Sequence, residues 1–399
     1  MRNFTGLKRF YYFYSHVKGF KQKKYNSKVS DFNIFNSMNL KSVSNLRKNL
    51  QKGAKIVAIG GGTGLSTMLR GLKMHTSNLT AVVTVADDGG GSGILRKDLG
   101  IIPPGDIRNC ILALAETEPV MEQLLQYRFQ EGMLKGQSFG NLFLAAMNGI
   151  SSSFVEAVKR MSDVLAVKGK VLPVTTINVQ LCAELENGEI IIGESKIGER
   201  NPNRKCRIKR VYLKPENAKP LDEVLEAINE AEAIIMGPGS LYTSIMPNLV
   251  VPGISEAIKN SKAIKIYVCN IMTQPGETDG YTVTDHIKAI EDHTFNGIID
   301  YCIVNTASIP QKLKEKYLEE GAQVVRIDCE KIKELDINMI YRDLIDENNN
   351  FLRHDPRKLA MAITDIINRI YKNKRNKLNH KISGETSLQR NQGKGLYFF

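Results

Sequence analysis

The most constraining feature of the sequence is an apolar, β-branched run that leads directly into five residues dominated by glycine. Ile56–Ile59 is followed by Gly60-Gly61-Gly62-Thr63-Gly64, and helix-forming residues come next. Glycines let backbone N–H groups approach an anion closely, and the start of a helix adds positive partial charge. The pattern therefore predicts a strand, a phosphate-binding loop lined by Gly61, Gly62, Thr63 and Gly64, and a helix.

The spacing within this loop separates it from other glycine motifs. A full Rossmann fingerprint needs glycine where the chain has Leu65, and a Walker A motif needs Gly-Lys-Ser/Thr, which is absent here. A tubulin-like GTPase loop continues to a second glycine, whereas Leu65 and Ser66 follow here. A dinucleotide-dependent dehydrogenase and a purely structural turn remain alternatives. The loop alone therefore predicts a phosphate or nucleotide without naming it.

Strand-like and helix-like stretches alternate from Lys55 to Tyr371. Such alternation predicts the α/β class, with a Rossmann-like, doubly wound, mainly parallel sheet over residues 53–371 and a short strand at Val324–Ile327. Two β-rich runs joined by Asn187-Gly188, with a third run after them, predict an antiparallel β-rich insertion between about 170 and 215. Ligands of such sheets bind beyond the carboxyl ends of the strands, so the loops there should carry the chemistry.

The net charge of +13 is concentrated in the two tails. Residues 1–52 hold 12 Lys and Arg against one acid, and residues 372–399 hold seven against one acid. We expect both tails to be disordered and basic, with weak contact to anionic membranes, and we expect no specific nucleic-acid binding. The middle of the chain is mildly acidic, so the basic total does not describe the folded part.

The composition favours a cytoplasmic protein with reduced thiols. No stretch approaches the roughly 20 apolar residues that span a bilayer. The amino-terminal residues lack the apolar core of a signal peptide. The six cysteines are scattered and no two form a CxxC pair, which argues against a zinc site or a disulfide framework.

Two acids and a glycine run follow the second predicted strand, in ADDGGGSG (Ala86–Gly93). Asp87 and Asp88 suit Mg²⁺, which prefers one or two carboxylates together with substrate phosphates. Ser92 can donate a hydrogen bond to an anion. Both aspartates are therefore our candidate metal ligands and catalytic groups, and the alternative is that they cap a turn.

Two further loops place polar residues at predicted helix starts. In PPGDIRN, Asp106 suits a ligand contact or a helix cap, and Asn109 follows it. Arg108 stands in a first helical turn, where the helix dipole disfavours a cation, and an anionic partner would explain it. In QSFGNL, capping explains Ser138, whereas Asn141 has less structural reason and is a candidate ligand contact.

A second glycine- and hydroxyl-rich loop, GPGSLYTS, follows the predicted strand Ala233–Met236. Its Gly239, Ser240 and Tyr242 suit phosphates. Asn270 ends the next strand, and Tyr281 offers a ring that can stack on a base. Six polar loops that all follow strands outline one cleft along the carboxyl edge of the sheet.

Taken in order, these motifs resemble the YvcK family, a group of bacterial gluconeogenesis factors that is in turn similar to CofD, the 2-phospho-L-lactate transferase. The resemblance covers about Lys55 to Tyr371 and leaves out the tails. It rests on GGGTGLS, TVADDGGGSG, PPGDIRN, SFGNL, GPGSLYTSIMPN and NIMTQPGETD. Six motifs in one order make it specific.

The resemblance implies a Rossmann-like fold with a nucleotide-diphosphate ligand. Two residues depart from the family pattern: Gly91 stands where the family has serine, and Gln137 stands where it often has a titratable histidine. Both departures favour binding over catalysis. By position, the resemblance assigns Gly61–Gly64 to the diphosphate, Asp87 and Asp88 to metal or sugar, Asn141 to the ligand, and Gly239, Ser240, Leu241 and Tyr242 to the other side of the nucleotide.

The resemblance therefore implies a cytosolic UDP-sugar-binding regulator, linked to envelope synthesis, cell shape and growth on gluconeogenic carbon. Its expected partners are envelope-synthesis proteins, and the expected state is a homo-oligomer. The alternative is a phosphotransferase of the CofD type, in which Asp87 and Asp88 hold Mg²⁺. The motifs contain no evident pair of nucleophile and base, which favours the regulator.

Overall fold

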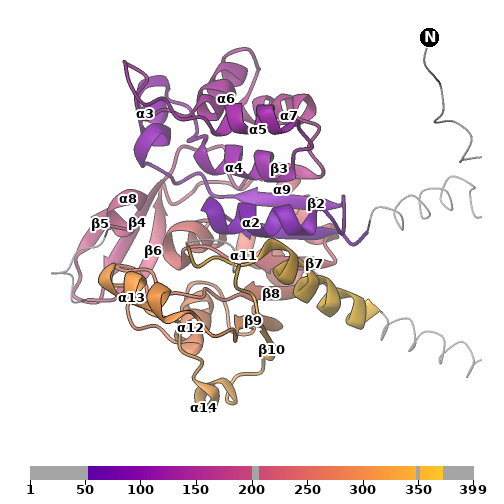
Figure 1. Ribbon diagram of the computed structural model, residues 1–399, viewed down its shortest axis with the longest axis vertical. Helices are drawn as coiled ribbons and strands as arrows, with labels where there is room; N and C mark the ends of the chain where they lie inside the picture. The colour runs from indigo at the N-terminus through magenta and orange to yellow at the C-terminus, as the bar shows by residue number, and fades with distance from the viewer. Residues whose placement is uncertain (1–52, 200–205, 347–350, 372–399) are drawn as a thin grey trace, which may run out of the picture. The chain divides into compact units, whose positions relative to one another are not determined.

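A seven-stranded parallel sheet forms the centre of the computed structural model, which describes residues 53–199, 206–346 and 351–371 (Figure 1). The predicted tails at 1–52 and 372–399 lie outside the described residues. The strands lie in the order β10-β9-β8-β7-β1-β2-β3, and each pairs with its neighbour in parallel. They are β1 (Ile56–Gly60), β2 (Leu79–Val83), β3 (Lys170–Pro173), β7 (Ala233–Met236), β8 (Ile264–Val268), β9 (Tyr301–Asn305) and β10 (Asn338–Arg342).

The chain changes its direction across the sheet next to β1. It runs from β1 through β2 to the edge strand β3, returns to the other side of β1 as β7, and continues outward to β10. The switch point therefore lies between β1 and β7, where ligands of doubly wound sheets bind. The predicted Rossmann-like, doubly wound, mainly parallel α/β fold is confirmed.

Helices cover both faces of this sheet (Figure 1). The strands β1 and β7 are buried along their whole length, as their apolar sequences require of parallel strands covered on both sides. In the part of the chain that the structure describes, no helix is long and apolar enough to cross a membrane. The main helices are α2 (Gly62–Leu72), α3 (Gly90–Leu99), α4 (Gly105–Leu114), α5 (Pro119–Gln126), α6 (Phe139–Gly149), α7 (Phe154–Val164), α9 (Asp222–Glu230), α11 (Ile254–Asn260), α12 (Val283–His293), α13 (Gln311–Glu319) and a last helix over 356–371.

A small antiparallel sheet forms the predicted insertion. Its strands β4 (Gln180–Leu185), β5 (Ile190–Ile192) and β6 (Ile208–Lys214) lie in the order β5-β4-β6. The turn at Asn187-Gly188 joins β4 to β5 as predicted, and Gly188 has a positive φ of 86°. The insertion begins later than the predicted residue 170, because β3 pairs in parallel with β2 and belongs to the main sheet.

Two other expectations fail locally. Val324–Ile327 forms no strand, and only isolated bridges join it to Met272 and Thr282, while the seventh strand is β10. The glycine run in ADDGGGSG predicts a loop, whereas Gly90–Leu99 forms the helix α3. Glycines are poor helix formers, so the two that begin α3 concealed it in the sequence.

Candidate functional site

The two glycine-rich loops meet at the switch point. A Cβ built on Gly64, in the first turn of α2, would lie 2.4 Å from the carbonyl oxygen of Pro238, after β7. The Asn248 side-chain amide fastens the loops further, because it donates to the Gly60 carbonyl at 3.0 Å and to the Ser244 carbonyl at 2.9 Å. The two loops are therefore in direct backbone contact and form one wall, so the expectation that they lie on opposite sides of the nucleotide diphosphate is wrong in this structure.

A cavity of about 440 Å³ opens beside this wall. Five predicted ligand contacts line it, and they come from the loops after β1, β7 and β8: Thr63, Gly64, Gly239, Ser240 and Asn270. Asn270 is tied to the wall, because its Oδ1 accepts from the Gly239 amide at 3.4 Å. The structure thus gathers the polar loop ends at the carboxyl edge of the sheet.

The opposite side of the cavity was not anticipated from the sequence. Tyr317 of α13, Arg353 and His354 line it, together with residues that follow β8. The Tyr317 hydroxyl accepts from the Leu352 amide at 3.0 Å, which fixes the ring against the 351–354 segment. Arg353 is exposed and brings a positive charge to the cavity.

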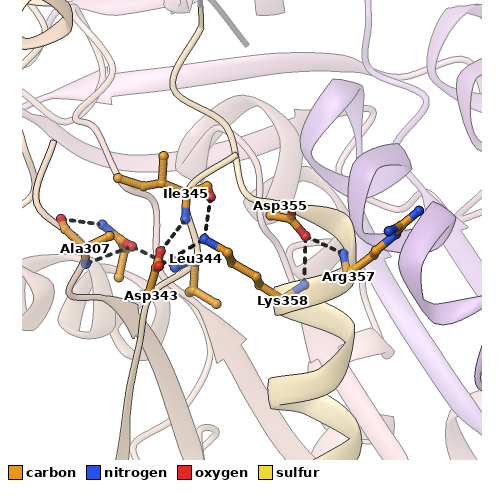
Figure 2. Close-up of polar contacts among 8 residues, drawn as sticks. Ala307, Asp343, Leu344, Ile345, Asp355, Arg357 and Lys358 are labelled. Carbon is orange, nitrogen blue, oxygen red and sulfur yellow. Dashed lines mark hydrogen bonds and ion pairs between the residues drawn. The ribbon is translucent and has the colours of Figure 1, made fainter. Parts of the chain in front are cut away.

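A set of polar contacts at the start of the last helix holds that segment in place (Figure 2). Lys358 Nζ donates to Asp343 Oδ2 at 2.9 Å and to the Ile345 carbonyl at 3.1 Å. The Asp355 amide donates to the Leu344 carbonyl at 2.7 Å. Since Ile345 also pairs with His354 in an antiparallel bridge, these contacts decide where Arg353 and His354 lie.

Carboxylates gather on the β2 side of the same edge. Asp87 Oδ1 accepts from the Gly89 amide at 2.9 Å, and Asp88 Oδ1 accepts from the Ser195 amide at 2.8 Å. Asp106 accepts from the Gly62 amide, and a Cβ built on Gly61 would lie 2.6 Å from Asp106 Oδ2. The glycine loop after β1 therefore separates the cavity from an acidic group.

Burial and mutual repulsion disturb the titration of these acids. Burial raises the pKa of Asp106 to about 6, and the charge of Asp87 adds to the shift. Burial also raises the pKa of Glu194 to about 8, with further repulsion from Asp87, Asp106 and Glu277. The pKa of Asp87 is raised for the same first reason, burial. When Asp87, Asp106 and Glu194 are all ionised, their negative charges repel one another, and this repulsion favours the protonated forms.

Such a donor set fits Mg²⁺ only with oxygens from a ligand. Asp87 and Asp88 hold different amides and do not form a closed cage. Among residues 53–199, 206–346 and 351–371, no three or more His, Cys, Asp or Glu side chains are placed to hold an ion by themselves. Mg²⁺ uses one or two carboxylates plus phosphates and water, so Asp87 with a bound phosphate remains a suitable pair of ligands.

A chain of polar contacts links three predicted residues behind these acids. Arg108 Nε donates to Asn141 Oδ1 at 3.1 Å, and Asn141 Nδ2 lies 3.5 Å from Ser92 Oγ. Ser92 donates in turn to Asp87. The residues come from α4, α6 and α3, so the structure brings them together, although none of them lines the cavity. Asn109 lies half-buried on α4 beside them.

Tyr242 and Tyr281 lie elsewhere than the prediction of base stacking requires. Their side chains are only 2% and 6% exposed, and their hydroxyls are 2.9 Å apart. Leu241 is fully buried beside Tyr242, whose backbone amide donates to Glu277 at 3.2 Å. Neither ring lines the cavity. Both are core residues in this structure, and Tyr317 supplies the aromatic ring at the cavity instead.

The two departures from the family pattern touch each other. Gln137 Oε1 lies 2.8 Å from the position that a Cβ on Gly91 would occupy. A side chain at 91 would therefore require the end of the Gln137 side chain to move. The two departures lie next to each other in the structure.

Comparison with known proteins agrees with this architecture. The profile of the family described as 2-phospho-L-lactate transferase CofD matches residues 56–345. The gluconeogenesis factor of Bacillus subtilis strain 168 is 50% identical over 314 residues, which cover 78% of this chain and 98% of that protein. The gluconeogenesis factor of Halalkalibacterium halodurans is 51% identical over 315 residues, 79% of this chain and 97% of that protein.

A solved structure shares the fold at similar identity. The crystal structure of a UPF0052-family protein from Bacillus halodurans has a TM-score of 0.75 and 50% identity, and the match covers 78% of this chain and 99% of that one. The profile match spans most of the described residues, and the full-length relatives carry one shared name. The chain therefore belongs to the CofD family and, within it, to the gluconeogenesis factors of the YvcK type.

Proposed function

We propose that this protein binds a nucleotide-diphosphate sugar of the UDP-sugar class in the cavity at the switch point. The observation that carries the proposal is the convergence of two glycine loops with Tyr317 and Arg353 around one cavity of about 440 Å³. Loop amides and hydroxyls suit a diphosphate, the arginine adds positive charge, and the tyrosine offers a face to a base. The volume falls in the ~300–1,000 Å³ range of small-molecule sites.

The proposed role of this binding is regulation in the cytoplasm. Its support is that the full-length relatives are named gluconeogenesis factors. We extend the proposal to cell shape and envelope synthesis, with envelope-synthesis proteins as partners and a homo-oligomer as the functional state. Ligand occupancy would then change the interaction with those partners.

Calorimetric titration of the full chain tests the binding step. UDP-N-acetylglucosamine should bind with a 1:1 ratio, more tightly than the matching ADP- and GDP-sugars, in the presence or absence of Mg²⁺. Absence of heat with all three donors, both with and without Mg²⁺, would overturn the proposal.

Removing the ring of Tyr317 should weaken UDP-N-acetylglucosamine binding about tenfold or more, because stacking of a base on an aromatic ring contributes ~1–3 kcal/mol. Calorimetry of the Tyr317→Ala variant measures the change. Tyr317→Phe keeps the ring and loses only the hydroxyl that accepts from Leu352, so its affinity should stay within about threefold of the wild type.

The exposed Tyr341 of β10 gives a matched control, because Tyr341→Ala removes a ring that does not line the cavity. Equal affinity of Tyr317→Ala and Tyr341→Ala would show that the base does not stack on Tyr317.

The acidic group favours a second candidate function, Mg²⁺-dependent phosphoryl transfer. Asp87, Asp106 and Glu194 lie close enough to repel one another, and a cation shared with a ligand phosphate would reduce that repulsion. Mg²⁺ in that position would neutralise charge on a transferred group. Phosphorus NMR of nucleotide-diphospho donors with Mg²⁺ tests it, and product formation that is lost in Asp87→Asn would support it. An unchanged spectrum across the donors would exclude it for those donors.

A further inference from the structure

Arg108 is a buried cation that is influenced by the charge of Asp106 but forms no hydrogen bond with that acid among the described residues. Only 9% of the surface of Arg108 is exposed to solvent. Only its Nε has a partner, Asn141 Oδ1 at 3.1 Å, and the two terminal nitrogens donate to nothing among the residues that the structure describes. The two terminal nitrogens are not among the buried atoms that lack a partner, so they reach solvent, where an anion can replace water. The terminal edge of the guanidinium is thus a pair of free donors of the shape that binds two oxygens of one anion.

The surroundings of Arg108 are also positive. Burial lowers the pKa of Arg108, and the positive charge of the neighbouring Arg128 lowers it further. Arg128 donates to the Gly136 carbonyl, which places it on the loop before α6. A Cβ built on Gly140 would lie 2.9 Å from Arg108 Cδ, so Arg108 crosses the amino-terminal end of α6. That end adds a positive partial charge.

A second buried polar group at this place lacks a partner. Gln137 is 6% exposed and its Oε1 receives no hydrogen bond among the described residues, but this oxygen is an acceptor that faces Gly91 and offers nothing to an anion. The Asn141 contact to Ser92 is long, at 3.5 Å. The charge of Asp106 offsets part of the positive charge of Arg108, while the Asp106 side chain accepts from the Gly62 amide and Asp87 accepts from Gly89 and Ser92.

We propose that Arg108, Arg128 and the amino-terminal end of α6 form a second anion-binding subsite, which takes a phosphate or carboxylate group of a second small molecule. Neither arginine lines the cavity assigned to the nucleotide. The subsite is therefore separate from that cavity, and it does not depend on which nucleotide the cavity takes. The Arg108 fork holds two oxygens of the anion, and Arg128 supplies the second charge from the loop.

Titration of inorganic phosphate into the full chain, followed by broadening of the phosphorus resonance, tests the subsite. Phosphate should bind the wild type, and binding should fall at least tenfold in Arg108→Gln. The exposed Arg128→Gln variant leaves the interior intact and should weaken phosphate severalfold. Arg160→Gln removes an exposed arginine of α7 that pairs with Glu156, and should change nothing. Equal phosphate affinity in all four proteins would overturn the proposal.

Two further experiments are needed. One distinguishes a phosphate from a carboxylate as the bound anion, and the other tests whether the anion and the nucleotide bind at separate sites. Acetate that displaces phosphate assigns the subsite to carboxylates as well, and acetate that does not displace it restricts the subsite to phosphates. Phosphate should still bind when UDP-N-acetylglucosamine is saturating, and direct competition in the wild type would overturn the separation. If the nucleotide fails to bind but phosphate binding depends on Arg108, the proposed function fails and the subsite stands.

Discussion

Replacing Gly64 with alanine should lower the affinity for UDP-N-acetylglucosamine on the order of 100-fold, an expectation taken from the ~100-fold loss of rate that a displacement of about 1 Å causes in an active site. The added Cβ would lie 2.4 Å from the Pro238 carbonyl oxygen and 3.0 Å from Gly239 Cα. Both are backbone atoms that cannot turn aside. The two glycine loops must therefore separate, and the diphosphate then loses one side of its site. Calorimetry measures the loss.

Gly149→Ala is the matched control. Gly149 ends α6, and a Cβ built on it meets nothing within 4 Å. Both substitutions replace a helical glycine by a residue with a better helix propensity, so only the contact with Pro238 differs. Circular dichroism should show both variants folded. Wild-type affinity in folded Gly64→Ala protein would mean that the nucleotide does not use this wall.

Asp106→Asn should make the protein more stable at pH 8 and have little effect at pH 4. Asp106 has a pKa of about 6 in the folded protein against an ordinary value of 3.8. The folded state therefore binds an extra proton between these values, and stability conferred at low pH is lost as the pH rises through about 6. The ionised carboxylate costs about 2–3 kcal/mol above that pH. Asparagine keeps an acceptor for the Gly62 amide and carries no charge.

Thermal unfolding at both pH values measures this difference. A gain of about 2–3 kcal/mol corresponds to roughly 3–5 °C in a domain of this size. Asp98→Asn, at an exposed position on α3, should leave both melting temperatures unchanged. An equal gain for Asp106→Asn at pH 4 and pH 8 would contradict the raised pKa and point to a packing effect.

The glycine loops could be predicted because the glycines that they need are visible in a short stretch of the sequence. Close backbone approach needs glycine. Gly61, Gly64 and Gly239 each follow an apolar run that is easily recognised as a strand in the sequence. Parallel pairing then brings the loop ends to one edge without further information. The same alternation predicts a doubly wound parallel sheet, but it does not give the order of the strands or the switch point beside β1.

The residues on the far side of the cavity could not be predicted from any short sequence pattern. Tyr317 lies in a helix whose sequence resembles any exposed helix, and Arg353 lies after β10, a strand that the sequence did not reveal. Only tertiary contacts bring them to the cavity. Tyr281 attracted attention through its polar turn, yet its hydroxyl pairs with that of Tyr242 in the interior. The sequence pattern predicts the path of the backbone, but it does not predict which aromatic ring lines the cavity.

The clasp between Lys358, Asp343 and Ile345 has a consequence for synthesis of the protein. The glycine loops come from the first strands made, whereas the clasp that positions Arg353 and His354 comes last. A nascent chain that still lacks residues 356–371 holds every strand of the sheet and every residue that lines the cavity, but it lacks the Lys358 contacts to Asp343 and Ile345. The segment that carries Arg353 and His354 is therefore held in place only after Lys358 has been made.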